Sequence, residues 1–592
     1  MNKTFLSALT AVLPMLLVPA VLYSTESNSI RLDMEDGVVA GWGSTDVRYP
    51  EKLSRSGVSG QHKSDFSLDD AFSLDKEISL KAWRGESVSA QIVVVTGAEG
   101  ALDSLHAEVQ DFPCGVRTGF VGYVMTDELN RDGSGGCGYR RNADFDSSYV
   151  ADPIDHLTGA KAVAENSVQP LWLTVDVPRD IPAGKYDGLV RICDGSRELS
   201  SLRLTLEVSG RTLPEENDFH LDLWQNPYAV ARYYGVGPFS EAHFDMMRPI
   251  MQLYADAGGK VITASITHKP WDGQTYDPFE SMVTWMRKAD GTWLFDYTVF
   301  DMWVEFMMSL GVDSQINCYS MIPWRLSFQY FDQASNSLKF LDMVPGEAEY
   351  EEFWTRMLKS FAAHLREKGW FDITMIAMDE RPMDRMLAAV EVIKNADPDF
   401  RIAFEGNCHE ELLDVLDYYC IPIWDNYPEG AVEKRREEGK ITTWYTCCTE
   451  SWPNTFTFSY PAEAEWIGWY VAANGLDGYL RWAFNSWPED PMRDSRFTAW
   501  AAGDTYLVYP GGLSSIRFER LKAGITAYRK IMALREEFTR TGNRSGLARL
   551  EKALSLFRLP DADAVRQHVL DKDMPDFAAD AVNAAKKILD RY

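Results

Sequence analysis

The first third of the chain places hydrophobic residues at every second position. Residues 171–177 alternate aliphatic and other side chains, and residues 202–208 repeat the pattern. A period of two is typical of a β-strand with one buried face. Further strands are expected at 78–83, 87–95 and 118–125. Because no helical pattern separates these segments, the sequence predicts an N-terminal antiparallel β-sandwich over residues 29–212.

Beyond residue 213 the pattern changes to short apolar runs, each followed by a helical period. The runs are residues 220–224, 261–267, 314–320, 373–379, 401–405, 420–424, 441–446 and 478–482. The helices that follow them are expected at 240–257, 299–310, 350–368, 383–395, 410–419, 431–438, 462–473 and 516–536. Eight such units close a (β/α)₈ (TIM) barrel, here over residues 213–540. A doubly wound open sheet is the alternative, but no glycine-rich phosphate loop accompanies it.

The last segment, residues 541–592, is charged and has a helical pattern at 547–557, 562–570 and 577–589. We expect a short helical C-terminal appendage that packs on the rest of the protein and has no chemistry of its own. The fold class is therefore a multidomain chain: a β-sandwich, a (β/α)₈ barrel and a helical tail.

Charge and the N-terminus restrict the partners and the location. A formal net charge of −29 argues against nucleic acid and against an anionic membrane surface. Lys3 followed by an apolar stretch at 5–23 is typical of a secretory signal peptide, expected over residues 1–28. An uncleaved anchor is the alternative. We expect an exported protein, periplasmic, cell-surface or secreted, with no membrane span in the mature chain.

The eight cysteines include no C-x-x-C pair, and the sequence does not reveal their pairing. No spacing of histidines, cysteines and acids indicates a metal site. We therefore predict neither a metal nor another cofactor.

An acid pair ends the fourth strand of the predicted barrel. The apolar run 373–378 leads directly into Asp379 and Glu380, and Pro382 stops it. Buried charge is expensive, so two acids at the end of a buried strand suggest chemistry. The structural alternative is that Asp379 caps the next helix while Glu380 pairs with Arg381 or Arg385.

Catalytic groups of a barrel lie on the loops after its strands. Aromatic, amide and acidic residues occupy these positions, a combination suited to binding and cleaving a glycosidic bond. The partner is therefore expected to be a glycan or glycoconjugate. The residues predicted to bind it are Trp224, His268, Tyr319, Asn407, Asp425, Trp444, Tyr445, Trp482 and Asn485.

Hydrolysis usually needs a second carboxylate on another strand, but the seventh strand has none before Glu450. Neighbouring acids fit a different mechanism, in which the 2-acetamido oxygen of the substrate attacks the anomeric carbon. Glu380 would be the general acid and later the base, and Asp379 would orient the acetamide. Adjacent residues of a strand point to opposite faces, so this hypothesis requires a kink after Asp379.

Several segments of the chain resemble those of glycoside hydrolase family 123, the β-N-acetylgalactosaminidases, and more loosely those of the family 20 hexosaminidases. These are the acid pair, residues 223–228, 444–448 with 453–455, and 478–485 with the helix opening at 517–525. The resemblance covers roughly residues 80–535. It implies a sandwich followed by a barrel, retention of configuration, no metal, and terminal β-linked GalNAc as substrate.

Three functions remain open at this point. The first is an exported glycoside hydrolase that removes terminal β-linked N-acetylhexosamine, with GalNAc favoured, by the substrate-assisted mechanism. The second is a glycosidase for sugars without an acetamide, with Asp425 or Glu405 as the second carboxylate. The third is a non-catalytic glycan-binding protein on a barrel that has lost its activity.

Overall fold

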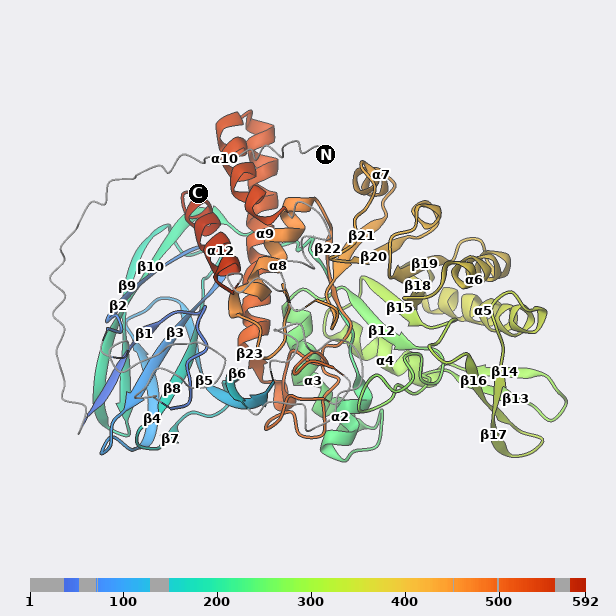
Figure 1. The fold of residues 1–592 in the computed structure, drawn as a ribbon, viewed down its shortest axis with the longest axis horizontal. Coiled ribbons are helices and arrows are strands. Elements are labelled where there is room, and N and C mark those ends of the chain that lie inside the picture. The colour runs from blue at the N-terminus through green and yellow to red at the C-terminus, as the bar shows by residue number, and fades with distance from the viewer. Residues whose placement is uncertain are drawn as a thin grey trace, which may run out of the picture.

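The computed structural model describes residues 37–52, 71, 73–127, 148–450, 452–497, 500–558 and 575–592. The segment expected to be a signal peptide and the helix expected at 562–570 lie outside these residues. Figure 1 shows the sandwich on the left and the barrel on the right, with α9 (Ile516–Thr541) standing between them.

The predicted sandwich is confirmed as two sheets. The first has six strands in the order β1 (Val38–Gly43), β3 (Ser87–Thr96), β8 (Val168–Asp176), β5 (Gly115–Thr126), β6 (Ser148–Asp155) and β23 (Ser514–Ser515). The second has five, in the order β2 (Glu77–Arg84), β10 (Arg197–Thr212), β9 (Gly184–Asp194), β4 (Leu102–Gln110) and β7 (Lys161–Val163). Alternate aliphatic side chains of both sheets form one core. One pair departs from the antiparallel prediction, since β2 and β10 run parallel.

The predicted barrel is also confirmed. Its strands are β11 (His220–Leu223), β12 (Val261–Ser265), β15 (Gln315–Tyr319), β18 (Thr374–Asp379), β19 (Arg401–Glu405), β20 (Tyr418–Pro422), β21 (Ile441–Tyr445) and β22 (Gly478–Arg481). All are parallel to their neighbours, and a bridge between Leu221 and Gly259 joins the two ends of the sheet. The carboxyl ends of all eight strands therefore open on one side.

The barrel helices are α2 (Pro227–Tyr234), α3 (Glu241–Asp256), α4 (Thr298–Ser309), α5 (Ala348–Lys368), α6 (Met383–Ala396), α7 (Ala431–Glu437) and α8 (Pro461–Asn474), followed by α9. The prediction of a helix at 410–419 is wrong. Only the turn η3 (Glu410–Leu412) forms there, because Tyr418 and Tyr419 are buried as the first residues of β20.

A small sheet that the sequence did not reveal is inserted after β12 and β15. It has the order β14 (Trp293–Asp296), β13 (Thr284–Arg287), β16 (Ser327–Asp332) and β17 (Ser337–Asp342). Figure 1 shows it projecting from the barrel on the side away from the sandwich.

A buried ion cluster joins the sandwich to the barrel. Asp152 of β6 accepts hydrogen bonds from Arg517 of α9 at 3.0 Å, from Arg48 at 3.0 Å and from the Tyr509 hydroxyl at 2.7 Å. Strand β23, just before α9, also pairs with β6. These contacts fix the two domains against each other.

The tail helices α10 (Arg544–Leu554) and α12 (Pro575–Leu589) cover α8 and α9. The carbonyl of Tyr592 accepts hydrogen bonds from Ser209 and Arg211 of β10, each at 2.9 Å, so the end of the chain is tied to the sandwich. Among the helices of the described residues, none combines the length and the apolar character needed to cross a bilayer.

Candidate active site

The acid pair of β18 lies at the centre of the site. Asp379 is the last residue of the strand and only 6% exposed. Glu380 follows with φ 44°, a left-handed conformation that is uncommon for a non-glycine residue. Its N–H donates to the Glu405 carbonyl at 2.6 Å. This turn is the kink that the hypothesis of a substrate-assisted mechanism requires, and both carboxylates line the same pocket instead of facing opposite sides of the sheet.

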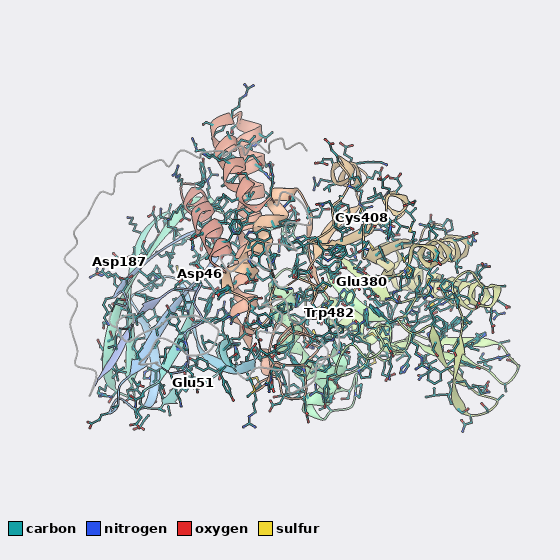
Figure 2. All side chains as sticks on the ribbon, in the orientation of Figure 1. Asp46, Glu51, Asp187, Glu380, Cys408 and Trp482 are labelled. Carbon is teal, nitrogen blue, oxygen red and sulfur yellow. The ribbon has the colours of Figure 1, made fainter. Side chains whose placement is uncertain are left out.

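The pocket opens at the carboxyl ends of the barrel strands and encloses about 130 Å³. Figure 2 shows Glu380 and Trp482 in the middle of the barrel half, far from Asp187 and Glu51 on the sandwich. The lining residues are Trp224, Gln274, Trp324, Asp379, Glu380, Glu405, Tyr445, Cys447, Cys448, Thr449, Leu480, Trp482 and Trp500.

One oxygen of Asp379 is held and the other is available. Trp324 donates its indole N–H to Oδ2 at 3.1 Å, whereas Oδ1 has no hydrogen-bond partner among the described residues. Burial raises the pKa of Asp379 to about 6, the charge of Arg381 opposes this rise, and Glu380 adds to it. The free oxygen can accept a hydrogen bond from a ligand.

Glu380 is exposed to the pocket and is oriented by a tyrosine. The hydroxyl of Tyr445 donates to Oε1 of Glu380 at 2.8 Å. Tyr445 itself is only 4% exposed, so the donor is fixed in the wall of the pocket. This arrangement leaves the second oxygen of Glu380 for proton transfer at a ligand.

Glu405 is a third carboxyl group of the pocket. It is 2% exposed and pairs in register with Asp379 on the neighbouring strand. The Tyr319 hydroxyl donates to its Oε1 at 3.0 Å. Burial, together with the nearby Asp222 and Asp379, raises the pKa of Glu405 well above its ordinary value.

Of the residues predicted to bind the sugar, three line the pocket: Trp224, Tyr445 and Trp482. Trp224 packs against Trp271 and Tyr319, each at a ring distance of 4.7 Å. Trp482 donates its N–H to Asp504 at 3.3 Å, which holds its ring in the wall. The half-buried Trp482 can present an apolar face to a sugar, whereas Trp224 is only 3% exposed.

Three other predicted residues are not among those that line the pocket. Trp444 is 1% exposed and packs between Tyr470 and Tyr479, because neighbours on a strand face opposite ways and Tyr445 takes the inward position. Tyr319 is fully buried beneath the pocket and acts on Glu405. His268 is paired with Glu280 at 2.6 Å.

The polar residues predicted to bind substrate instead hold the loops. The carbonyl of Asn407 accepts the Tyr419 hydroxyl at 2.7 Å. The carboxylate of Asp425 accepts the N–H groups of Cys408 at 2.6 Å and of Asn426 at 2.8 Å. The buried Asn485 bonds both the N–H and the carbonyl of Asn226, each at 2.9 Å. The side chains of Asp425 and Asn485 are therefore engaged in structure, whereas Asn407 takes part through its backbone carbonyl and is exposed.

The pocket also contains residues that the sequence reasoning missed. Trp324 is the most informative, since it lies five residues past the end of β15 and its N–H bonds Asp379. Trp500 donates its indole N–H to the Gln274 carbonyl at 2.6 Å, so two long loops meet at the rim. The position of Trp324 after a strand end was a usable signal, whereas the meeting of the loops was not.

Comparisons with known proteins decide the family. The model of the glycoside hydrolase 123 catalytic domain matches residues 224–534, and that of the glycoside hydrolase 123 N-terminal domain matches residues 42–194. The chain belongs to glycoside hydrolase family 123. The expected resemblance is thereby confirmed, and the protein is a glycoside hydrolase.

A solved structure supports this assignment over nearly the whole enzyme. A family 123 glycoside hydrolase from Clostridium perfringens, described for glycolipid glycan hydrolysis, is 26% identical with a TM-score of 0.79 and covers 93% of this chain and 99% of its own. A search of curated proteins found no match.

Two more distant structures are a xyloglucanase of family 5 from Bacteroides ovatus and a family 39 glycoside hydrolase from Bacteroides cellulosilyticus. The first is 9% identical with a TM-score of 0.27 and covers 76% of this chain and 98% of its own. The second is 11% identical with a TM-score of 0.33 and covers 76% of this chain and 81% of its own. Similarities this low indicate nothing about function.

Proposed function

We propose that the enzyme removes terminal β-linked N-acetylhexosamine, with GalNAc the favoured sugar, from glycans with retention of configuration. The observation that supports this best is the turn at Glu380, which directs two adjacent carboxylates into one pocket. One of them, Asp379, keeps an oxygen without a partner among the described residues. The N–H of a substrate acetamide would supply the missing hydrogen-bond donor to that oxygen.

In the first step Glu380 gives its proton to the glycosidic oxygen while the acetamide oxygen attacks the anomeric carbon. The bond to the leaving alcohol breaks and an oxazolinium ring forms. Asp379 accepts the acetamide N–H and stabilises the positive charge that develops on this ring. In the second step water attacks the anomeric carbon, Glu380 takes its proton, and the acetamide is restored. Two inversions at one carbon give retention.

The role of Asp379 requires its ionised form. Its pKa of about 6 places the change in charge close to neutrality. As the pH falls through about 6, Asp379 gains a proton and can no longer accept the N–H. We therefore expect kcat to decline on the acidic side of this value.

The alternative with a protein nucleophile is disfavoured by the two residues that it would use. Burial raises the pKa of Glu405 well above its ordinary value, which disfavours the ionised form that a nucleophile needs. Asp425 is engaged by two backbone N–H groups. The non-catalytic alternative is set aside because the chain belongs to a hydrolase family.

The substrate class and the location are also proposals. The Clostridium perfringens relative supports glycolipid glycans as candidate substrates. Cys448 is disulfide-bonded, which suits an oxidising compartment and an exported enzyme. The apolar stretch after Lys3 supports the same location.

A panel of nitrophenyl β-glycosides of GalNAc, GlcNAc, galactose and glucose tests the sugar. Turnover restricted to the two acetamido sugars is expected, and turnover of galactosides or glucosides alone would contradict the proposal. A GalNAc-derived thiazoline, which copies the cyclised intermediate, should inhibit strongly. A glycosyl adduct on Glu405 or Asp425 after treatment with 2-fluoro sugars, detected by mass spectrometry, would exclude the substrate-assisted mechanism.

Glu380→Gln tests the general acid. It should lower kcat by about 10²–10⁴-fold on substrates with poor leaving groups. Activated aryl glycosides should lose less in the first step because their leaving oxygen needs little protonation. An equal loss on both substrate types would indicate another role for Glu380.

A further inference from the structure

Glu405 is a third acid of the pocket, and the proposed mechanism gives it no role. We propose that Glu405 contacts the sugar directly and donates a hydrogen bond from Oε2 to a ring hydroxyl, and so determines specificity. This inference rests on the proposed function, because it concerns the same pocket and the same sugar.

The position of Glu405 is fixed on the barrel and not on a loop. It ends β19 and lies directly beside Asp379 of β18 in the parallel ladder. Its own carbonyl holds the turned N–H of Glu380 at 2.6 Å. A ligand that touches Asp379 and Glu380 therefore lies within the same lining as the Glu405 side chain.

The hydrogen bonds beneath the pocket show which of the two carboxyl oxygens of Glu405 has a partner and which does not. Oε1 accepts the hydroxyl proton of Tyr319 at 3.0 Å, and the Tyr319 oxygen in turn accepts from Asn317 at 3.4 Å. Oε2 is buried and has no partner among the described residues. A buried polar atom without a partner is costly, and a bound ligand can supply the missing one.

The surroundings of Glu405 favour its neutral form, in which Oε2 carries the proton. Burial is the main cause of its raised pKa. The titratable groups around it are Asp222 of β11, Tyr319 of β15, Asp379 of β18, and Tyr418 and Cys420 of β20. The charges of Asp222 and Asp379 oppose a Glu405 carboxylate, whereas the hydrogen bond donated by Tyr319 favours it; burial and the two acids prevail, so the pKa is raised.

The chemistry of a bound sugar identifies the acceptor. The acetamide N–H goes to Asp379 and the glycosidic oxygen goes to Glu380, which leaves the ring hydroxyls. A hydroxyl oxygen is a good acceptor for a protonated carboxyl group. A site that hydrogen-bonds a hydroxyl strongly rejects an analogue that lacks it, because the buried donor is then unpaired.

Two substitutions by side chains of similar size test whether Glu405 acts as a hydrogen-bond donor or as a carboxylate. Glu405→Gln keeps a donor and an acceptor, and we expect a fall in kcat/KM of about 3–10-fold. Glu405→Met removes both and should raise KM about 10–100-fold. Glu410→Gln, at an exposed position after the same strand, is the matched control and should behave as wild type.

Deoxy substrates locate the hydroxyl. Nitrophenyl β-GalNAc lacking the 3-, 4- or 6-hydroxyl should each be compared on wild type and Glu405→Met. One deoxy sugar should lose about tenfold or more on wild type and little further on the variant, which is the signature of a direct contact. Additive losses for all three sugars would overturn the contact.

The pH dependence of substrate affinity distinguishes hydrogen-bond donation by Glu405 from action as a nucleophile. Wild type should lose affinity on the alkaline side as Glu405 ionises, and Glu405→Gln should not show that limb. If Glu405→Gln is as inactive as Glu405→Met at every pH, an ionised carboxylate is required and the inference fails.

A binding measurement keeps the inference separate from the proposed function. Titration of free GalNAc, GlcNAc, galactose and glucose by calorimetry needs no turnover. If wild type hydrolyses no acetamido sugar, the proposed function fails, yet weaker sugar binding by Glu405→Met still supports the contact. Unchanged binding by a folded Glu405→Met would overturn it, and if that variant does not fold, the profile of Glu405→Gln decides.

Discussion

Asp152 at the domain interface and Asp379 in the pocket are both buried carboxylates, at 0% and 6% exposure, yet their surroundings differ in charge. Burial alone would raise the pKa of Asp152, but Arg517 and Arg48 bond it directly and hold its pKa below the ordinary value. Asp379 has one indole N–H and a single more distant arginine, so burial prevails and its pKa rises to about 6. The interface neutralises its charge and gains rigidity, whereas the pocket leaves an acid incompletely satisfied and so available to a ligand.

The largest expected effect is the loss of activity when the pocket carboxylate of this comparison, Asp379, is replaced. Asp379→Asn keeps the size of the side chain but removes the charge that, in the proposed mechanism, stabilises the oxazolinium ring. We expect kcat to fall by about 10²–10³-fold with little change in KM, and weak inhibition by the GalNAc thiazoline. Steady-state kinetics check this, with Asp384→Asn on the exposed start of α6 as the control.

The stability of the same variant should change in the opposite direction. A pKa raised from 3.8 to about 6 means that the ionised form is disfavoured in the folded state. At pH 8, Asp379→Asn should therefore raise the free energy of unfolding by about 1–3 kcal/mol, and at pH 4 the gain should vanish. A loss of stability at pH 8 would show that the carboxylate is well solvated or paired.

The next effect concerns the interface. Asp152→Asn leaves Arg48 and Arg517 buried without their counter-charge, and the free energy of unfolding should fall by about 3 kcal/mol. Asp176→Asn removes an exposed ion pair with Arg117 and should cost less than about 1 kcal/mol. Chemical denaturation measures both. Equal effects of the two substitutions would mean that the cluster does not lock the domains.

The sequence was sufficient to predict the features that depend on local pattern. The alternation at 171–177 and the run ending in Asp379-Glu380 are set by strand periodicity and burial, and both the sandwich and the barrel follow from them. The expected kink after Asp379 was a geometric requirement of the hypothesis. The structure supplies it as a positive φ at Glu380.

Features that depend on distant contacts could not be predicted in the same way. Trp444 and Tyr445 are adjacent on β21, and which of them faces inward depends on the register with β20 and β22. Trp324, Gln274 and Trp500 reach the pocket from loops whose paths are fixed by hydrogen bonds across the rim. Asp152 meets Arg517 over 365 positions of the sequence, and no local pattern reports such a pair.

A second effect on stability follows from Asp222, the acid beneath the pocket. Burial raises the pKa of Asp222 from 3.8 to about 8, so its contribution to stability is fully present below pH 4 and is lost as the pH rises through about 8. Asp152, with its lowered pKa, changes only at acidic pH and does not affect this window. Asp222→Asn should flatten the fall in stability between pH 5 and 8 and raise the free energy of unfolding at pH 8 by several kcal/mol, on the order of 5. Parallel pH profiles for the variant and wild type would contradict this.

The smallest expected change in activity concerns an aromatic residue of the pocket wall, and a core tryptophan serves as its comparison. Trp482 is half-buried and lines the pocket, so Trp482→Ala should raise KM by about tenfold, the worth of one aromatic contact. The melting temperature of Trp482→Ala should change little, because the ring is only half-buried at the pocket wall, where it contacts Trp500 at a ring distance of 5.6 Å. Trp444→Ala is the matched core variant and should lose about 3–5 kcal/mol of stability, because its buried ring leaves a cavity. KM of the folded Trp444→Ala fraction should stay near that of wild type. If both variants lose stability equally and neither changes KM, Trp482 is a core residue and the sugar does not stack on it.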